Sequence, residues 1–304
     1  MSRLTILDGG MGRELKRMGA PFSQPLWSAQ ALIEAPQCVT QAHQAFINAG
    51  AEIITVNSYA CVPFHLGETL YQAQGATLAQ QAAVIAKEAA QKTKQNVLVA
   101  GSLPPAFGSY RADFFQSERA FTILDTLYKA QDEYVDIWIG ETISSIEEAH
   151  VMARMLKNSN KPCYYAFTLS DEVSEQATLR SGELVSDAIL ALLEYNIAGI
   201  FFNCSIPEVI EQALRDTSTV LKQQNKNVDL GAFANGFTPI ASDYKANEGS
   251  QGYRDLSPAE YVAFAKQWHN LGATIIGGCC GIGPEFIAAL VKWKRDIKAL
   301  KLIE

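Results

Sequence analysis

Short apolar runs rich in β-branched and aromatic residues recur along the chain, with longer stretches of helical pattern between them. Runs of this length and composition predict buried β-strands. Eight can be recognised, at residues 5–10, 51–59, 96–102, 135–142, 162–170, 198–205, 228–236 and 273–280. Their alternation with helical segments predicts a parallel sheet, because parallel strands need long crossover connections.

The segments between the strands carry helix signals. Residues 36–49 begin at Pro36 and end before Gly50, as expected of a helix. Residues 72–93 and 117–134 are also predicted to be helical. Capping-box spacing is present at three pairs, Ser144 with Glu147, Ser205 with Glu208 and Ser257 with Glu260. Three prolines stand near predicted helix starts, namely Pro207, Pro258 and Pro284.

Eight strand–helix units are the number found in a (β/α)8 TIM barrel. No linker or low-complexity segment divides the chain, so we expect residues 1–304 to form a single barrel domain. An open doubly wound sheet is the alternative fold. It lacks its usual support, because no G-x-G-x-x-G motif follows the first strand.

Composition narrows the classes of partner. The 304 residues are 48% hydrophobic and 19% charged, which excludes a disordered chain. The net charge of −7 disfavours a nucleic acid or an anionic membrane as partner and leaves a small molecule. No apolar run is long enough to span a membrane, and the N-terminus lacks the apolar stretch of a signal peptide. We therefore expect a cytoplasmic protein; its oligomeric state is not predicted.

Polar and reactive residues end many of the predicted strands. In a barrel these ends converge on one face, where active sites are built. Turns favour Asp and Asn, which by itself accounts for Asn57 and Asn235. It does not account for Glu141 after an apolar strand, nor for the cysteines at strand ends, Cys204, Cys279 and Cys280.

The cysteines suggest metal chemistry, since thiols in the cytosol serve metal binding or catalysis more often than disulfides. Cys279 and Cys280 lie among glycines that allow the backbone to leave extended geometry and turn both thiols to one side. With Cys204 they would form an incomplete tetrahedral zinc site, and catalytic zinc keeps one position open. A thiol substrate suits that position, because zinc deprotonates a coordinating thiol.

Other interpretations remain open for these residues. Buried cysteine often acts as a small hydrophobic residue, the role expected for Cys38, Cys61 and Cys163. Cys204 could be a core residue or a lone thiol, and Cys279 and Cys280 could be packing residues or a vicinal redox pair. Their flanking glycines could instead bind phosphate, although no basic residue stands nearby. The four histidines are expected outside the site: His43, His65, His150 and His269.

Two carboxylates are candidates for binding a substrate ammonium. Asp8 precedes two glycines whose N–H groups could approach a carboxylate, and Glu141 ends the fourth strand. The alternatives are an ordinary Asp-Gly turn for Asp8 and a salt bridge at the rim for Glu141.

In combination, these motifs resemble the homocysteine S-methyltransferases. The resemblance rests on DGGMG at 8–12, ET at 141–142, NC at 203–204 and GGCC at 277–280, and it extends to PLWSA at 25–29 and to residues 43–59. It covers essentially the whole chain.

The resemblance implies a (β/α)8 barrel that binds zinc through the three strand-end cysteines and homocysteine as the fourth ligand. Asp8 and Glu141 would recognise its ammonium, beside the backbone of Gly9, Gly10 and Met11. The product would be methionine, with S-methylmethionine or S-adenosylmethionine as methyl donor. Asn57, Asn203 and Asn235 are further candidates for the site.

Two loops depart from the family pattern. Residues 233–239 read FANGFTP where relatives often have a PNSGE-like segment, and residues 101–114 also differ. Both are expected to border the donor pocket, so betaine or another donor remains an alternative. A zinc- or redox-sensing barrel without catalysis, or a methyltransferase component with another acceptor, are the competing hypotheses.

Overall fold

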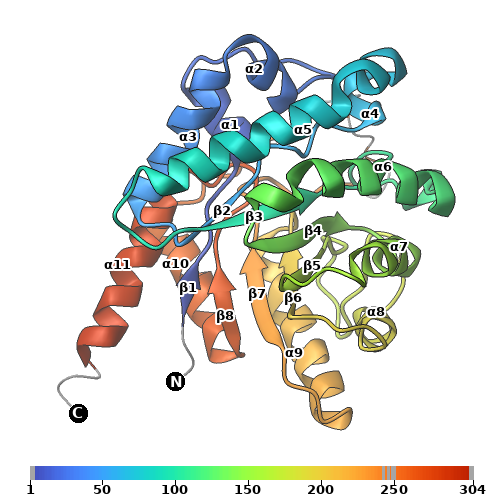
Figure 1. The fold of residues 1–304 in the computed structure, drawn as a ribbon. Helices are drawn as coiled ribbons and strands as arrows, with labels where there is room; N and C mark the ends of the chain where they lie inside the picture. The colour runs from blue at the N-terminus through green and yellow to red at the C-terminus, as the bar shows by residue number, and fades with distance from the viewer. Residues whose placement is uncertain (1–3, 242–243, 245–246, 248–250, 301–304) are drawn as a thin grey trace.

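The eight apolar runs form eight parallel strands of one sheet in the computed structural model, which describes residues 4–241, 244, 247 and 251–300 (Figure 1). The strands are β1 Thr5–Ile6, β2 Ile53–Thr55, β3 Leu98–Leu103, β4 Ile137–Ile143, β5 Cys163–Phe167, β6 Gly199–Asn203, β7 Asp229–Phe233 and β8 Ala273–Ile276. Hydrogen-bonded neighbours follow the order β1-β8-β7-β6-β5-β4-β3-β2.

The two ends of this sheet meet and close the barrel. The N–H of Asp8 donates to the carbonyl of Ile53 at 2.9 Å, and the N–H of Glu52 donates to the carbonyl of Ile6 at 2.7 Å. These bonds join β1 to β2, so the predicted (β/α)8 barrel is confirmed. The absence of a dinucleotide fingerprint had correctly favoured the barrel over an open sheet.

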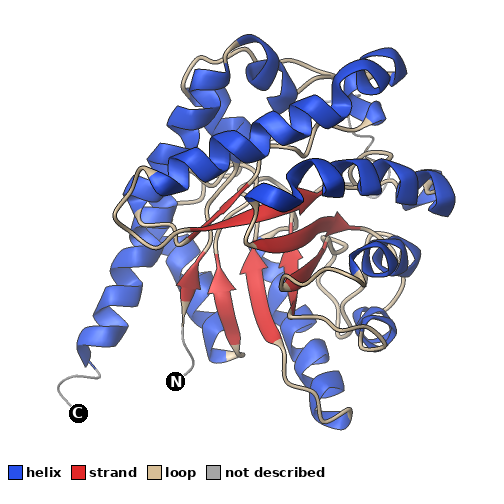
Figure 2. Ribbon diagram, in the orientation of Figure 1, coloured by secondary structure: helices blue, strands red, loops and turns tan. Residues whose placement is uncertain are grey.

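Helices surround the strands (Figure 2). They are α1 Met11–Arg17, α2 Ser28–Glu34, α3 Pro36–Ala49, α4 Pro63–Leu66, α5 Glu68–Gln91, α6 Ser117–Gln131, α7 Ile146–Leu156, α8 Val185–Leu192, α9 Pro207–Gln223, α10 Pro258–Asn270 and α11 Pro284–Leu300, with short 3-10 helices at Ala112–Phe114 and Asp132–Tyr134. Within the described residues, no helix has the length and apolarity needed to cross a membrane.

Some of the predicted helix starts and caps are confirmed, and others are wrong. The helix over 36–49, its end at Gly50 with φ 102°, and the three proline starts are confirmed. The capping box of Ser257 with Glu260 is present.

The other two capping boxes are wrong. Strand β4 continues to Ile143, so the next helix starts later and Ser145, not Ser144, accepts from Glu148 N–H at 3.2 Å. Ser205 lies one residue before the N-cap of α9 and instead accepts the N–H of Leu169 at 2.8 Å. For the first pair the capping lies one residue later than predicted, and for the second no side-chain cap forms.

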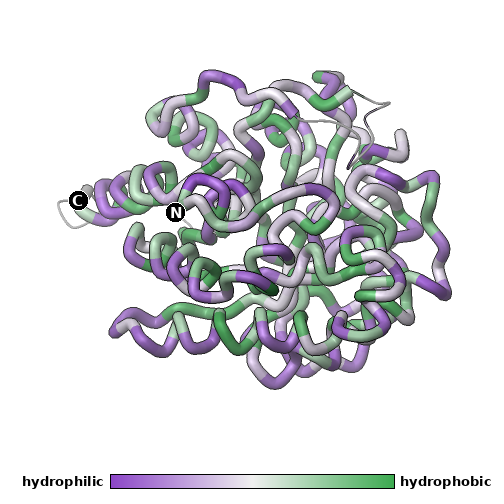
Figure 3. The backbone as a smooth tube through the Cα atoms, turned by 90° about the horizontal axis from the view of Figure 1, so that it is seen from above, coloured by the Kyte–Doolittle hydropathy of each residue, from purple (hydrophilic) through white to green (hydrophobic). Residues whose placement is uncertain are grey.

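Apolar side chains of the described strands pack together in the barrel interior. Phe201 from β6 stacks on Tyr164 from β5, with ring centroids 4.8 Å apart, and Phe233 from β7 packs edge-on against Phe201. A second apolar layer joins the strands to the helices, and polar and apolar segments alternate along those helices (Figure 3).

Phe201→Ala tests this packing. Removing a fully buried ring from the barrel interior should lower the free energy of unfolding by about 3–5 kcal/mol, measured by chemical denaturation. Leu190→Ala on α8, where the side chain is largely exposed, serves as the control and should change stability by no more than about 0.5 kcal/mol. Equal losses in the two variants would contradict a packed interior.

Candidate metal and substrate site

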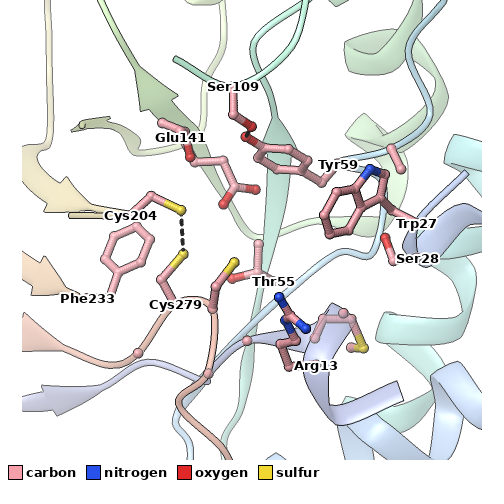
Figure 4. Close-up of a pocket in the computed structure, with 18 of the residues that line it drawn as sticks. Arg13, Trp27, Ser28, Thr55, Tyr59, Ser109, Glu141, Cys204, Phe233 and Cys279 are labelled. Atoms are coloured by element: carbon pink, nitrogen blue, oxygen red, sulfur yellow. Dashed lines mark hydrogen bonds between the residues drawn. The ribbon is translucent and has the colours of Figure 1, made fainter. Parts of the chain in front are cut away.

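A pocket opens at the carboxyl ends of the strands, the face on which barrel enzymes place their active sites. Its walls come from the end of β4 and from the loops after β1, β2, β3, β6, β7 and β8 (Figure 4). The predicted residues that line it are Asp8, Gly9, Gly10, Met11, Asn57, Glu141, Cys204, Cys279 and Cys280. Residues far apart in the sequence thus meet in one cavity.

The three strand-end thiols form one cluster. The Sγ atoms of Cys204 and Cys279 are 3.0 Å apart, and all three sulfurs lie within 4.8 Å of one another. Sulfurs bound to one zinc ion at about 2.3 Å in tetrahedral geometry stand nearly 4 Å apart. The cluster therefore fits a thiolate metal site in donor chemistry, although the Cys204 and Cys279 sulfurs lie closer together than sulfurs that share one zinc ion.

Local backbone geometry turns these thiols together. Cys204 follows β6 with a left-handed φ of 52°, and Gly281 after the cysteine pair has φ 85°. The N–H of Cys279 donates to the Ala234 carbonyl at 2.9 Å, which holds the loop after β8 against the loop after β7. A Cβ on Gly278 would overlap the Ile282 side chain, so the tight turn requires glycine there.

One of the three thiols favours the anionic form, whereas the pKa values of Cys204 and Cys279 are raised. Hydrogen bonds from Cys204 and Cys279 hold the pKa of the Cys280 thiol well below its usual range, and the nearby Arg13 guanidinium adds to this effect. A cluster that already stabilises one thiolate attracts a cation.

Asp8 and Glu141 face the same pocket, at the ends of β1 and β4. Asp8 accepts the N–H of Thr55 at 2.7 Å and its hydroxyl at 3.1 Å, while Glu141 accepts the Ser102 hydroxyl. Burial raises the pKa of Asp8 to about 8 and that of Glu141 to about 7, in spite of these hydrogen bonds. Two desolvated carboxyls suit a cationic ligand, which would compensate their ionised form.

Asn203 lies behind the pocket wall. Its Oδ1 accepts the N–H of Thr142 at 3.0 Å, and its Nδ2 donates to the Thr142 hydroxyl at 3.0 Å. Thr142 has φ 59° and follows Glu141, at an irregularity in the pairing of β4 with β5. Such irregularities re-aim side chains. Asn203 therefore fixes the backbone on both sides of the site, next to Glu141 and to Cys204.

The remaining asparagines hold loops. Asn57 lines the pocket and donates from Nδ2 to the Ser28 carbonyl at 3.3 Å. Asn235 is fully buried, and its Oδ1 accepts the N–H of Phe237 at 3.1 Å. Both loops that depart from the family pattern do border the pocket, through Ser109 and Tyr110 after β3 and through Phe237 after β7.

Sequence reasoning missed several pocket residues. Arg13 on α1 and a set of aromatic side chains complete the lining, namely Phe22, Trp27, Tyr59, His65, Tyr110, Phe233 and Tyr244. For Tyr59 and Tyr110 the available signal was their position in loops that follow strands. Tyr59 stands two residues after Asn57. His65 was expected outside the site, and this expectation is wrong, because His65 lines the pocket. Its ring nitrogen Nδ1 lies 3.1 Å from the Pro25 carbonyl, beside Trp27.

The other cysteines stand apart from this pocket. Cys61 and Cys163 are buried, and burial raises the pKa of their thiols to about 12 and about 11. Cys38 is half-buried on α3 and packs against the core. None of the three lines the pocket among the described residues, in agreement with a packing role.

The sequence of this chain is similar to those of known proteins. The sequence pattern of the homocysteine S-methyltransferase family matches residues 5–293. Homocysteine S-methyltransferase 1 from Brassica oleracea var. italica is 28% identical, over 96% of this chain and 93% of its own length. Homocysteine S-methyltransferase from Escherichia coli (strain K12) is 29% identical, over 94% of each chain.

A solved structure has a similar fold. The metallated form of the homocysteine methyltransferase MmuM from Escherichia coli superposes with a TM-score of 0.77 at 25% identity, covering 95% of this chain and 96% of its own. The fold and the strand-end site define a barrel methyltransferase. More particularly, the chain belongs to the homocysteine S-methyltransferase family.

Asn203→Ala should destabilise the fold. The substitution leaves the buried N–H of Thr142 without its acceptor, at a cost of about 1–3 kcal/mol in the free energy of unfolding. Asn158→Ala, at an exposed position after α7, is the control and should leave stability almost unchanged. If the Asn203 variant is as stable as the wild type, the hydrogen bonds between Asn203 and Thr142 contribute nothing to the free energy of unfolding.

The raised pKa of Asp8 predicts a pH-dependent stability in metal-free protein. Because the folded-state pKa of about 8 exceeds the ordinary 3.8, folding favours the protonated carboxyl and stability falls as pH rises through this window. Asp8→Asn should therefore be more stable than the wild type at pH 8, by about 1–3 kcal/mol. The difference should vanish towards pH 4, when both proteins are neutral at this position.

Urea titrations across that pH range measure the effect. Asp187→Asn, an exposed carboxylate in the first turn of α8, is the matched control. A constant difference between the Asp8 variant and the wild type at all pH values would contradict the prediction.

Proposed function

We propose that the protein transfers a methyl group from a sulfonium donor, S-methylmethionine or S-adenosylmethionine, to the thiol of homocysteine, and so forms methionine. The proposal rests on one observation: three clustered thiols share a pocket with two carboxylates and a wall of aromatic rings. Membership of the family supports homocysteine as the acceptor.

The thiol cluster is the proposed zinc site. Cys204, Cys279 and Cys280 would hold Zn²⁺, which supplies Lewis-acid stabilisation of a bound thiolate at neutral pH. Three protein ligands leave room for one more, as expected of catalytic zinc. The substrate thiol fits that position because its own chemistry matches the sulfur donors around it.

The two carboxylates would orient the acceptor. Asp8 and Glu141 would accept hydrogen bonds from its ammonium, which would compensate the charge of two desolvated groups. The Gly9, Gly10 and Met11 backbone borders the same space. Holding the ammonium on one side and the sulfur on the other fixes the thiolate for attack.

The aromatic wall supports a cationic donor. Trp27, Tyr59 and Tyr110 present rings to the pocket, and ring faces attract cations. The acidic net charge of the chain and the carboxylates at the site also favour a positively charged donor. A sulfonium group fits these surroundings, while betaine, a quaternary ammonium, is the alternative that the donor assay must exclude.

The reaction is a single displacement. The homocysteine sulfur donates an electron pair to the methyl carbon, and the bond from that carbon to the donor sulfur breaks with its electrons leaving on the donor. The donor thus becomes a neutral thioether and needs no proton. The acceptor thiol releases its proton to solvent water before the attack, so the protein mainly aligns the three reacting atoms.

A donor panel tests this function. The zinc-loaded protein is incubated with homocysteine and, separately, S-methylmethionine, S-adenosylmethionine, betaine or methyltetrahydrofolate, and methionine is quantified by mass spectrometry. We expect methionine with a sulfonium donor and none with the other two. Product from betaine alone would overturn the sulfonium assignment, and no product from any donor would favour a sensor or a component with another acceptor.

The cysteine ligands provide a second prediction. Cys204→Ala and Cys279→Ala should each lose the bound zinc, about one ion per chain in the wild type, together with methionine formation. Cys38→Ala, outside the pocket, should keep both. Elemental analysis and the methionine assay on the same samples measure the two properties, and activity that survives thorough zinc removal would contradict the mechanism.

A further inference from the structure

Arg13 is the pocket residue that the proposed reaction leaves without a role. It lies on α1, five residues after Asp8, and its half-buried side chain points into the cavity beside the cysteines (Figure 4). Among the described residues that line the pocket, it is the one side chain with a permanent positive charge. His65 is neutral there, since burial lowers its pKa to about 4.

The guanidinium is held by ring faces. Its central carbon lies 5.0 Å from the centroid of Phe237 and 4.8 Å from that of Tyr253, both in the segment after β7. No carboxylate or other hydrogen-bond acceptor within the described part of the chain pairs with it. Stacking on rings uses the faces of a guanidinium and leaves its N–H edge for planar, bidentate acceptors.

The charge of the pocket makes that edge significant. Asp8, Glu141 and the three thiols border the acceptor space, and each of these groups is negative when it ionises. An amino acid brings an ammonium that suits these groups, but it also brings an α-carboxylate that they repel. A fixed cation in the same cavity removes this conflict.

We propose that Arg13 is the carboxylate receptor of the site, and that it selects amino-acid substrates by pairing its guanidinium with their α-carboxylate. The inference rests on the proposed function and goes further, because it names the residue that recognises the carboxylate of an amino-acid substrate. Homocysteine and the amino-acid sulfonium donors all carry such a carboxylate, so either substrate can be the source.

Paired ligands separate these sources. Isothermal titration of the zinc-loaded protein compares homocysteine with aminopropanethiol, the same molecule without its carboxyl group. A second pair compares S-methylmethionine with its decarboxylated analogue, aminopropyl dimethylsulfonium. The ratio of affinities within a pair measures the carboxylate contribution, and the pair with the larger ratio identifies the bound substrate.

Arg13→Gln should abolish the preference for the carboxylate-bearing member of that pair, a loss of about 10- to 100-fold in affinity for it. The affinity for the decarboxylated member should stay within about twofold. Arg13→Lys keeps the charge without the bidentate edge and should retain part of the preference. Lys16→Gln removes a charge from the exposed side of the same helix and should change neither ratio.

Two results would overturn the inference. One is a wild type with no preference within either pair, and the other is an Arg13→Gln variant that weakens both members equally, as expected if the residue only clamps the segment after β7. Titration measures binding rather than turnover, so a failed methyl-transfer assay beside an intact carboxylate preference would refute the reaction and leave the role of Arg13 in place.

Discussion

Closure of the barrel is the constraint on which the site depends. The bonds between β1 and β2 fix a ring of strands whose carboxyl ends share one face, and residues from opposite halves of the sequence meet there. Cys204 and Cys279 thereby come into direct sulfur contact. Left-handed backbone at Cys204 and Thr142 adds local strain, which the surrounding hydrogen bonds maintain.

Electrostatics then determines what such a site can bind. Thiols and carboxyls line one pocket, and burial raises the pKa of both Asp8 and Glu141. Cations would relieve this unfavourable concentration, and the proposed function assigns a metal to the sulfurs, an ammonium to the carboxylates and a sulfonium to the rings. Arg13 supplies the opposite charge at one point, so that a zwitterion rather than a simple amine fits the whole cavity.

The sequence was sufficient for the fold and for the chemistry that strand ends carry. Eight apolar runs predicted the barrel, and reactive residues at their ends predicted the thiol cluster and Glu141. It was insufficient where position depends on tertiary contacts. Asn203 acts through Thr142, a partner on another strand, and Arg13 reaches the pocket from a helix of only seven residues. The aromatic wall was missed because loop side chains have no periodicity that points to a cavity.

X-ray absorption at the zinc edge tests the central claim most directly. The account predicts three sulfur ligands at about 2.3 Å in the zinc-loaded protein, and four sulfurs once homocysteine is added. In Cys204→Ala the protein-derived sulfur shell should not form. A zinc environment of nitrogen and oxygen ligands, or a spectrum that homocysteine leaves unchanged, would contradict an acceptor thiolate held by the three cysteines.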